Sequence, residues 1–126
     1  MGWAGKIFAN TLFVEDLNIS RVFYSSIFEK SPVFEDENSI VFKFGEILIN
    51  LLAQSQAPSL IGPALVASKS SGSRFQLTIH VDDVDSQAQR LMELGVSLIN
   101  GPMDRPWGSR TVLFADPDGH LWELAQ

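Results

Sequence analysis

The chain ends in the stretch Asp116-Pro117-Asp118-Gly119-His120-Leu121-Trp122-Glu123-Leu124-Ala125, and the rest of the sequence is best interpreted from it. A Pro-Asp-Gly turn leads into a short strand in which residue character alternates. One acid, Glu123, stands inside this strand with apolar neighbours on both sides. Because an unpaired carboxylate is costly to bury, Glu123 must face water, a cation or a hydrogen-bond donor.

Composition predicts one globular domain and excludes several classes of partner. The chain has 126 residues, of which 45% are hydrophobic and 19% charged, which is enough for a sizeable core. Its net charge is −6 and it has no run of Lys and Arg, so neither a nucleic acid nor an anionic membrane is an expected partner. It has no cysteine, no basic-then-apolar leader and no long apolar run. We therefore expect a cytoplasmic protein without disulfides or thiolate metal sites.

Each half of the chain is predicted to hold a strand, a helix and three further strands. In the first half these elements are expected at 6–14, 17–28, 33–35, 39–44 and 47–52. In the second half they are expected at 75–81, 84–94, 96–99, 110–115 and 120–125, with a loop at 100–108. Asp16 and Asp82-Asp83 are predicted helix caps. The apolar stripe of the first helix is assigned to Ile19, Val22, Phe23 and Ile27.

Residues 53–74 differ in composition from the segments on either side and are interpreted as a linker between the halves. The segment is rich in Ser and Gln, contains Pro58 and Pro63, and has an apolar piece at 60–66. That piece is either a loop packed locally on the surface or a flap or contact between subunits, and both interpretations stay open.

The two halves are a weak internal duplication. The run Val14-Glu15-Asp16-Leu17-Asn18 corresponds to Val81-Asp82-Asp83-Val84-Asp85, with a strand end, an acidic cap and a helix start in each. A half with one helix and one small sheet has an uncovered sheet face. Two such sheets side by side are predicted to form a trough, with helices outside and a cavity within.

These residues resemble the vicinal oxygen chelate superfamily, which includes glyoxalase I, extradiol dioxygenases, and fosfomycin- and bleomycin-resistance proteins. The carriers are four motifs in the expected order: Val14-Glu15-Asp16-Leu17 with Ser20, Phe23 and Tyr24; Val81-Asp82-Asp83-Val84; Gly101-Pro102 with Pro106-Trp107-Gly108; and Asp116-Pro117-Asp118-Gly119 with Glu123. The resemblance implies an α+β fold of paired βαβββ modules that form an open, cupped mixed sheet. It also implies a single domain over 1–126, with modules at 6–52 and 75–126, and a homodimer.

The resemblance also implies where a metal would bind. Metal-dependent members place ligands five residues before the strand-ending valine of each half and in the last strand of each half. Here these positions hold Ala9, Gln76, Asn50 and Glu123. Alanine has no ligand atom, and neutral amides are rarely the main ligands of zinc, nickel or iron(II). We therefore expect no metal and no other cofactor, with a divalent ion as the less favoured possibility.

Several side chains are candidates for the walls of the cup. Glu123 is expected to face the cavity, either as a ligand anchor or satisfied internally by Arg110 or Gln76. Gln76, Thr78 and His80 share one strand face, opposite Leu77, Ile79 and Val81. His80 is either an acid–base group or a partly exposed strand-end residue, and His120, after a turn, is expected to be exposed.

Aromatic residues and Arg110 complete the predicted site. Trp107, held between Pro106 and Gly108, is expected to stack on a flat ligand rather than only pack in its loop. Phe13 is expected to line the cup, and Arg110 is expected to pair with a ligand anion or with Glu123. Trp122 alternates away from Glu123 and is assigned to the core under the helices.

The sequence therefore favours a bleomycin-resistance-like protein that binds an aromatic or amphipathic small molecule without a catalytic metal. The ligand-binding residues would be Phe13, Asn50, Gln76, Trp107, Arg110 and Glu123. The alternative is an enzyme, a glyoxalase-like lyase, isomerase or dioxygenase, which uses an atypical metal site or acid–base chemistry through Glu123 and His80. A third interpretation is a dimeric protein whose cup is vestigial.

Overall fold

The protein has two compact units, and the boundary between them follows Ala67, inside the predicted linker. The structure, a computed structural model, describes residues 2–126. Each unit has the order β-α-β-β-β, apart from short helical segments between β4 and β5, and contains one four-stranded mixed sheet. The strand orders, β1-β4-β3-β2 and β5-β8-β7-β6, are the same pattern twice. This confirms the predicted α+β class of paired βαβββ modules.

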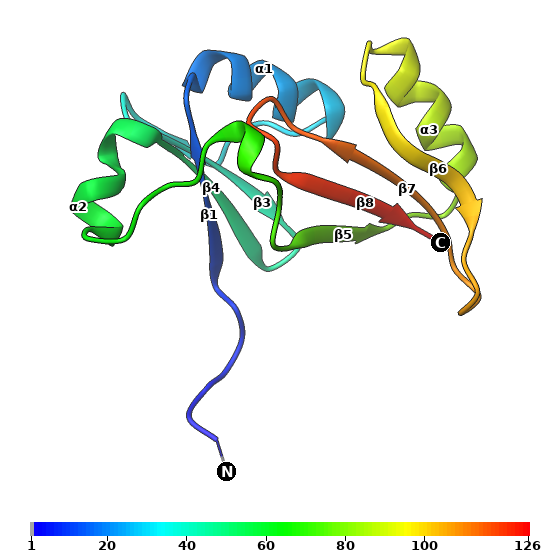
Figure 1. Cartoon of the computed structure of the whole chain (residues 1–126), viewed down its shortest axis with the longest axis horizontal. Coiled ribbons are helices and arrows are strands. Elements are labelled where there is room, and N and C mark those ends of the chain that lie inside the picture. The colour runs from blue at the N-terminus through cyan, green and yellow to red at the C-terminus, as the bar shows by residue number, and fades with distance from the viewer. Residues whose placement is uncertain (1) are drawn as a thin grey trace. The chain divides into compact units, whose positions relative to one another are not determined.

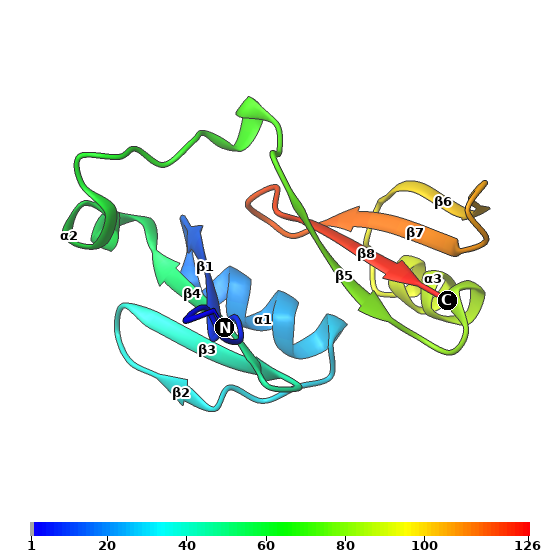
Figure 2. The same ribbon diagram turned by 90° about the horizontal axis from the view of Figure 1, so that it is seen from below.

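Unit 1 builds its sheet around the parallel pair of β1 and β4. Its elements are β1 (Ala9–Val14), α1 (Leu17–Ile27), β2 (Phe34–Glu35), β3 (Ser39–Phe44) and β4 (Ile47–Ala53). Figure 2 shows α1 lying along one face of β1, β4 and β3. After β4 the chain forms a short turn at Gln54–Gln56, α2 (Ala57–Ile61) and a second turn at Lys69–Ser71. The predicted linker therefore contains a short helix, which Pro58 at its first turn favours.

Unit 2 repeats this plan with β5 (Gln76–His80), α3 (Val84–Glu93), β6 (Leu98–Asp104), β7 (Arg110–Ala115) and β8 (Leu121–Ala125). In Figure 1, α3 runs beside β6. The parallel pair is here β5 and β8, and β7 joins β8 to β6 in antiparallel fashion. The predicted loop at 100–108 is wrong in its first half, because β6 continues to Asp104 through two register shifts.

Acidic caps begin both long helices, α1 and α3, as the sequence predicts. The Asp16 carboxylate accepts hydrogen bonds from the backbone N–H groups of Asn18 and Ile19. The Asp83 carboxylate accepts one from the N–H of Ser86. Such a cap satisfies backbone donors that the first helical turn leaves without partners. The two similar sequence runs, 14–18 and 81–85, therefore correspond to the same structural feature, the capped start of the helix in each unit.

The core of each unit lies between its helix and its sheet. On α3 the buried residues are Val84, Ala88 and Leu91, which lie on one stripe of the helix. Beneath them the sheet contributes the buried residues Val112, Phe114 and Trp122, so the assignment of Trp122 to the core is confirmed. Burial of one such large apolar side chain stabilises the fold by about 1.5–3 kcal/mol.

The buried stripe of α1 differs from the predicted one. Ile27 is buried as predicted, but it shares the buried side with Ser20 and Tyr24, whereas Ile19 and Val22 are exposed. The apolar residues of this helix occupy more than one side, so periodicity alone did not identify the inner face. Tyr24 fixes it, because its ring is fully buried and stacks on that of Phe42 with 5.8 Å between centroids. None of the helices in residues 2–126 is long and apolar enough to cross a membrane.

Candidate functional site

The candidate site is the face of the unit 2 sheet opposite α3, which we call the open face of unit 2. Strand alternation and the pairing registers place nine residues on it: Gln76, Thr78, His80, Thr111, Leu113, Ala115, Leu121, Glu123 and Ala125. The burial pattern agrees on β5, where Gln76, Thr78 and His80 are exposed and the two intervening residues are less so. The shared face predicted for these three residues is confirmed.

Glu123 lies near the middle of the open face of unit 2. In the sheet it pairs with Thr78 on one side and with Leu113 on the other. The Thr78 hydroxyl donates a hydrogen bond of 3.0 Å to the Glu123 carboxylate. Neither Arg110 nor Gln76, the partners considered from the sequence, bonds to it. A hydroxyl satisfies one acceptor position and adds no positive charge, so most of the carboxylate's capacity to accept hydrogen bonds is unused.

Unit 1 repeats this polar pair at the equivalent register. Thr11 pairs with Asn50 across β1 and β4, and the Asn50 side-chain amide donates to the Thr11 hydroxyl at 3.3 Å. Phe13 follows two residues later on the same face of β1 and is half-buried. The repeat of threonine beside the last-strand polar residue is visible in the sequence, because Thr11 follows Ala9 as Thr78 follows Gln76.

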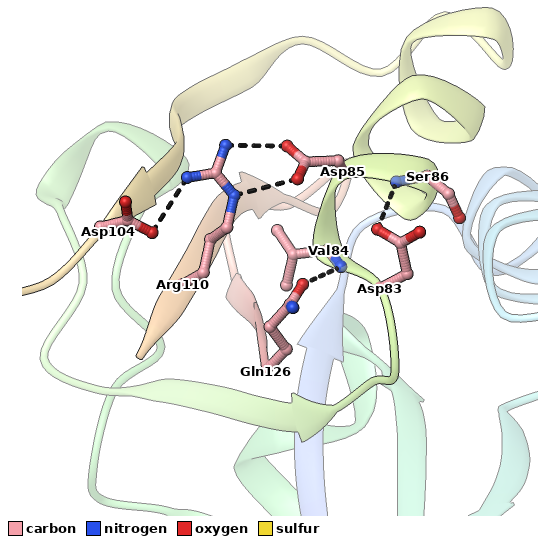
Figure 3. A network of polar contacts seen from close by, with 7 residues as sticks. All are labelled: Asp83, Val84, Asp85, Ser86, Asp104, Arg110 and Gln126. Carbon is pink, nitrogen blue, oxygen red and sulfur yellow. Dashed lines mark hydrogen bonds and ion pairs between the residues drawn. The ribbon is translucent and has the colours of Figure 1, made fainter. Parts of the chain in front are cut away.

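Arg110 does not lie on the open face of unit 2, which corrects the expectation that it would pair with Glu123. Its Nε and Nη2 atoms donate to the two carboxylate oxygens of Asp85 at 3.0 and 2.9 Å. Its Nη1 atom donates to Asp104 at 3.1 Å. Figure 3 shows the guanidinium between these acids, beside the start of α3. Arg110 therefore ties β7 to α3 and β6 on the helix side of the sheet.

The charges of this network stabilise one another's ionised forms. The hydrogen bonds from Arg110, with its positive charge, lower the pKa of the Asp85 carboxyl below its ordinary value. The hydrogen bonds to Asp85 and Asp104 raise the pKa of Arg110 further above its already high value. Nearby, the Gln126 side-chain oxygen accepts a hydrogen bond of 2.7 Å from the N–H of Val84, which satisfies one more backbone donor of the first turn of α3.

The arginine on the side of Glu123 is Arg105, which sequence reasoning did not select. Its Nε atom donates to the Thr111 hydroxyl at 2.9 Å, and its Nη2 atom donates to the Asn100 side-chain oxygen at 3.1 Å. Thr111 belongs to the open face of unit 2, so this guanidinium does too. The signal in the sequence was the six-residue run from Arg105 to Arg110, whose two arginines face opposite sides once the chain folds back as a hairpin.

Trp107 lies at the tip of this hairpin and is 72% exposed. The Arg105 Cζ atom lies 5.9 Å from the centroid of its ring, within reach of a cation–π interaction. Two backbone hydrogen bonds close the turn, from Arg105 to Ser109 at 2.7 Å and from Gly108 to Arg105 at 3.0 Å. The exposed indole is thus carried on an ordered turn beside a cation.

The two histidines differ in setting. His80 ends β5 on the open face of unit 2 and is exposed. His120 is not exposed as predicted: its side chain is only 22% exposed, and Nδ1 lies 2.8 Å from the buried Asp116 carboxylate. That carboxylate also accepts from the N–H groups of Asp118 and His120. His120 therefore belongs to the turn that leads into β8.

The four positions that the superfamily resemblance assigns to metal ligands are poor in donors. Ala9 offers no ligand atom, and Asn50 and Gln76 are neutral amides. Of the four, only Glu123 has a charge to neutralise a cation, and its carboxylate accepts from Thr78. Within residues 2–126, no three His, Asp or Glu side chains gather as a metal-binding group. These residues do not fit a divalent metal centre.

Known proteins resemble the chain over nearly its full length. The sequence model of the family described as Glyoxalase-like domain matches residues 8–126. The uncharacterized protein YraH of Bacillus subtilis (strain 168) is 32% identical over 94% of this chain and 96% of its own. The metallothiol transferase FosB of Bacillus licheniformis is 25% identical over 88% of this chain and 68% of its own. A glyoxalase/bleomycin resistance protein/dioxygenase from Nocardioides has the same fold, with a TM-score of 0.87 at 21% identity, over 99% of this chain and 85% of its own.

Proposed function

The chain belongs to the glyoxalase-like family, and from this we propose that it binds an aromatic or amphipathic small molecule on the open face of unit 2 without a catalytic metal. The observation that carries the proposal is the state of Glu123. Among residues 2–126 its carboxylate has one hydrogen-bond partner, the Thr78 hydroxyl, and no cation. A half-buried carboxylate with unused acceptor positions is suited to a ligand that donates hydrogen bonds.

The surroundings of Glu123 suit an amphipathic ligand. Leu113 is its direct neighbour on β7, and Leu121 stands two residues before it on the same face. These side chains offer apolar area, while the polar side chains of β5 offer further hydrogen bonds. Trp107 adds a flat, exposed surface at the hairpin tip. A few polar anchors in an apolar setting are typical of small-molecule sites.

Sequestration of a ligand needs no metal, which agrees with the donor set. Two amides and one methyl group stand where metal-dependent relatives of this superfamily place ligands, so a divalent ion would be poorly neutralised. Gln76 instead supplies an amide group that can accept hydrogen bonds from an organic molecule or donate them to it. The proposed roles on the open face of unit 2 are thus orientation by Glu123 and Gln76, and apolar contact by Trp107.

Binding of the neutral planar probe 2-naphthamide tests the proposal. Isothermal titration calorimetry on metal-stripped protein in EDTA should detect binding, and Trp107→Ala should weaken it. Trp3→Ala is the matched control, because Trp3 is 97% exposed on the segment before β1. Glu123→Gln should also weaken binding, because an amide is a poorer acceptor for the ligand's donors. Equal affinity in all four proteins would overturn the proposal, as would absence of binding to the wild-type protein by both this probe and the corresponding acid, 2-naphthoate.

The alternative is an enzyme of the same superfamily, a lyase, isomerase or oxygenase. The similarity to the metallothiol transferase FosB favours it, as does the position of His80 on the same face as Glu123. Metal analysis of protein purified without chelators separates the two proposals. The enzyme proposal expects a stoichiometric divalent ion that is lost in Glu123→Ala, whereas the sequestration proposal expects substoichiometric metal in both proteins.

The family resemblance also supports a homodimer. Multi-angle light scattering coupled to size-exclusion chromatography should give twice the mass of the chain. A mass equal to one chain at micromolar concentration would contradict this part of the proposal.

A further inference from the structure

Arg105 is a cation on the open face of unit 2 that the fold holds in place without neutralising it. Its hydrogen bonds go to the Thr111 hydroxyl and the Asn100 amide oxygen, both neutral acceptors. Over residues 2–126 no carboxylate lies within ion-pair distance of it. Arg110 is the internal contrast, because two carboxylates bind it on the other face of the same sheet.

The Arg105 guanidinium is oriented before any ligand arrives. The Nε and Nη2 atoms donate to Thr111 and Asn100. Among residues 2–126, none accepts a hydrogen bond from the N–H groups of Nη1. These neutral acceptors fix the orientation of the planar guanidinium but do not neutralise its charge, which remains available to pair with an anion. Backbone hydrogen bonds of Arg105 close the hairpin and hold the backbone of this residue in place. Little side-chain entropy therefore remains to be lost when an anion binds.

Trp107 places an exposed aromatic ring beside this cation. Arg105 lies 5.9 Å from the centroid of the indole, which is nevertheless 72% exposed. Arginine pairs with carboxylates in a planar, bidentate geometry, and an indole offers a large flat surface to an aromatic ring. A molecule that carries both groups would use both residues at once.

The position of Glu123 limits where the anion can lie. Thr111, which holds Arg105, stands diagonally across β7 and β8 from Glu123, since Glu123 pairs directly with Leu113. Such diagonal neighbours are about 7–8 Å apart. The open face of unit 2 is therefore negative at Glu123 and positive towards the β6–β7 hairpin. A ligand anion is attracted to the hairpin end and repelled from the strand that carries Glu123.

We propose that Arg105 and Trp107 form a subsite for the carboxylate of an aromatic acid. The proposal rests on the proposed function, since it names the class of ligand that the open face of unit 2 takes. The acid group lies against Arg105, the ring lies against Trp107, and the opposite, hydrogen-bond-donating end of the ligand points to Glu123.

The matched pair 2-naphthoate and 2-naphthamide tests this assignment, because the two probes have the same ring and differ in the charged group. Isothermal titration calorimetry should give about tenfold or greater preference for the acid in the wild-type protein, as expected for a charge-assisted hydrogen bond. Arg105→Gln should abolish the preference, and Arg105→Lys should retain part of it. Arg74→Gln, which removes an exposed arginine from the segment before β5, is the control and should leave the preference intact.

The outcomes separate this proposal from the proposed function. Equal affinity for acid and amide would overturn the subsite while leaving small-molecule binding intact. Loss of the preference in Arg110→Gln but not in Arg105→Gln would place the anchor on the other face and overturn it as well. Absence of binding by both probes would overturn both proposals. A second readout, the ¹⁵N-HSQC signal of the Arg105 Nε–H group, should shift more with 2-naphthoate than with 2-naphthamide at saturation.

Discussion

Replacement of Gly101 by alanine should destabilise the protein more than a glycine replacement in an open turn. Gly101 lies in β6 within the second register shift, between Asn100 and Met103, and has φ of +84°. A Cβ atom added there would collide with the carbonyl oxygen of Thr111 and lie 2.9 Å from the Cα atom of Val112. Both are backbone atoms of β7 in the middle of the sheet, so neither can move aside as a flexible side chain would.

The size of the effect follows from two contributions. A side chain in the left-handed region costs roughly 1–2 kcal/mol, and overpacking against fixed neighbours costs a further 1–3 kcal/mol or so. Gly101→Ala should therefore lower the free energy of unfolding by about 2–5 kcal/mol. Gly45→Ala is the matched control, because Gly45 also has positive φ, +63°, but nothing lies within 4 Å of its added Cβ. Its cost should be only about 1–2 kcal/mol.

Urea denaturation followed by circular dichroism measures both free energies, provided that the variants unfold in one cooperative transition with unchanged slope. The reasoning is refuted if Gly101→Ala loses no more stability than Gly45→Ala. Since Thr111 also holds Arg105, the same variant should reduce the preference for 2-naphthoate over 2-naphthamide, if it folds.

Three other perturbations have defined outcomes. Trp122→Ala removes a ring that is 2% exposed and should cost about 3–5 kcal/mol in urea denaturation; a loss below 1 kcal/mol or so would mean that the ring is not part of the core. Asp83→Ala removes the cap of α3 and should cost about 1 kcal/mol, whereas Asp83→Asn, which keeps an acceptor, should cost less. Asp85→Asn should be less stable than wild type at pH 6, and this gap should close as the pH falls below 3.8, the ordinary pKa of the carboxyl. The sign follows because Arg110 depresses the pKa of folded Asp85, so its stabilisation is present above the unfolded pKa and lost on protonation; a gap that persists at pH 2 would contradict it.

The order and type of most strands and helices follow from the sequence because they depend on local rules. The strands predicted at 39–44 and 110–115 have the bounds of β3 and β7, and acidic caps identified the starts of both long helices. Errors arose where local rules conflict with packing. Glycine and proline in 100–108 suggested a loop, but a sheet accepts them in β6, where register shifts make room for them.

The candidate site was predicted only in part, for a related reason. Glu123 was found because alternation places it opposite Trp122, and that assignment needs no partner strand. Its actual partner, Thr78, depends on the register between β5 and β8, which lie at opposite ends of the unit's sequence. Arg110 was selected and Arg105 was not considered, because nothing local in the sequence shows which of the two turns towards Glu123.

The sequence by itself determined the duplicated βαβββ plan, the family, and the replacement of expected metal ligands by Ala9, Asn50 and Gln76. These properties reside in residue identity and spacing along the chain. Only the tertiary structure decided which charges are neutralised. Arg110 meets Asp85 and Asp104 on the helix side, while Arg105 meets only neutral acceptors on the side of Glu123. The physical reason is that an ion pair depends on a few ångströms across strands, and that separation is set by register and by the turn between β6 and β7.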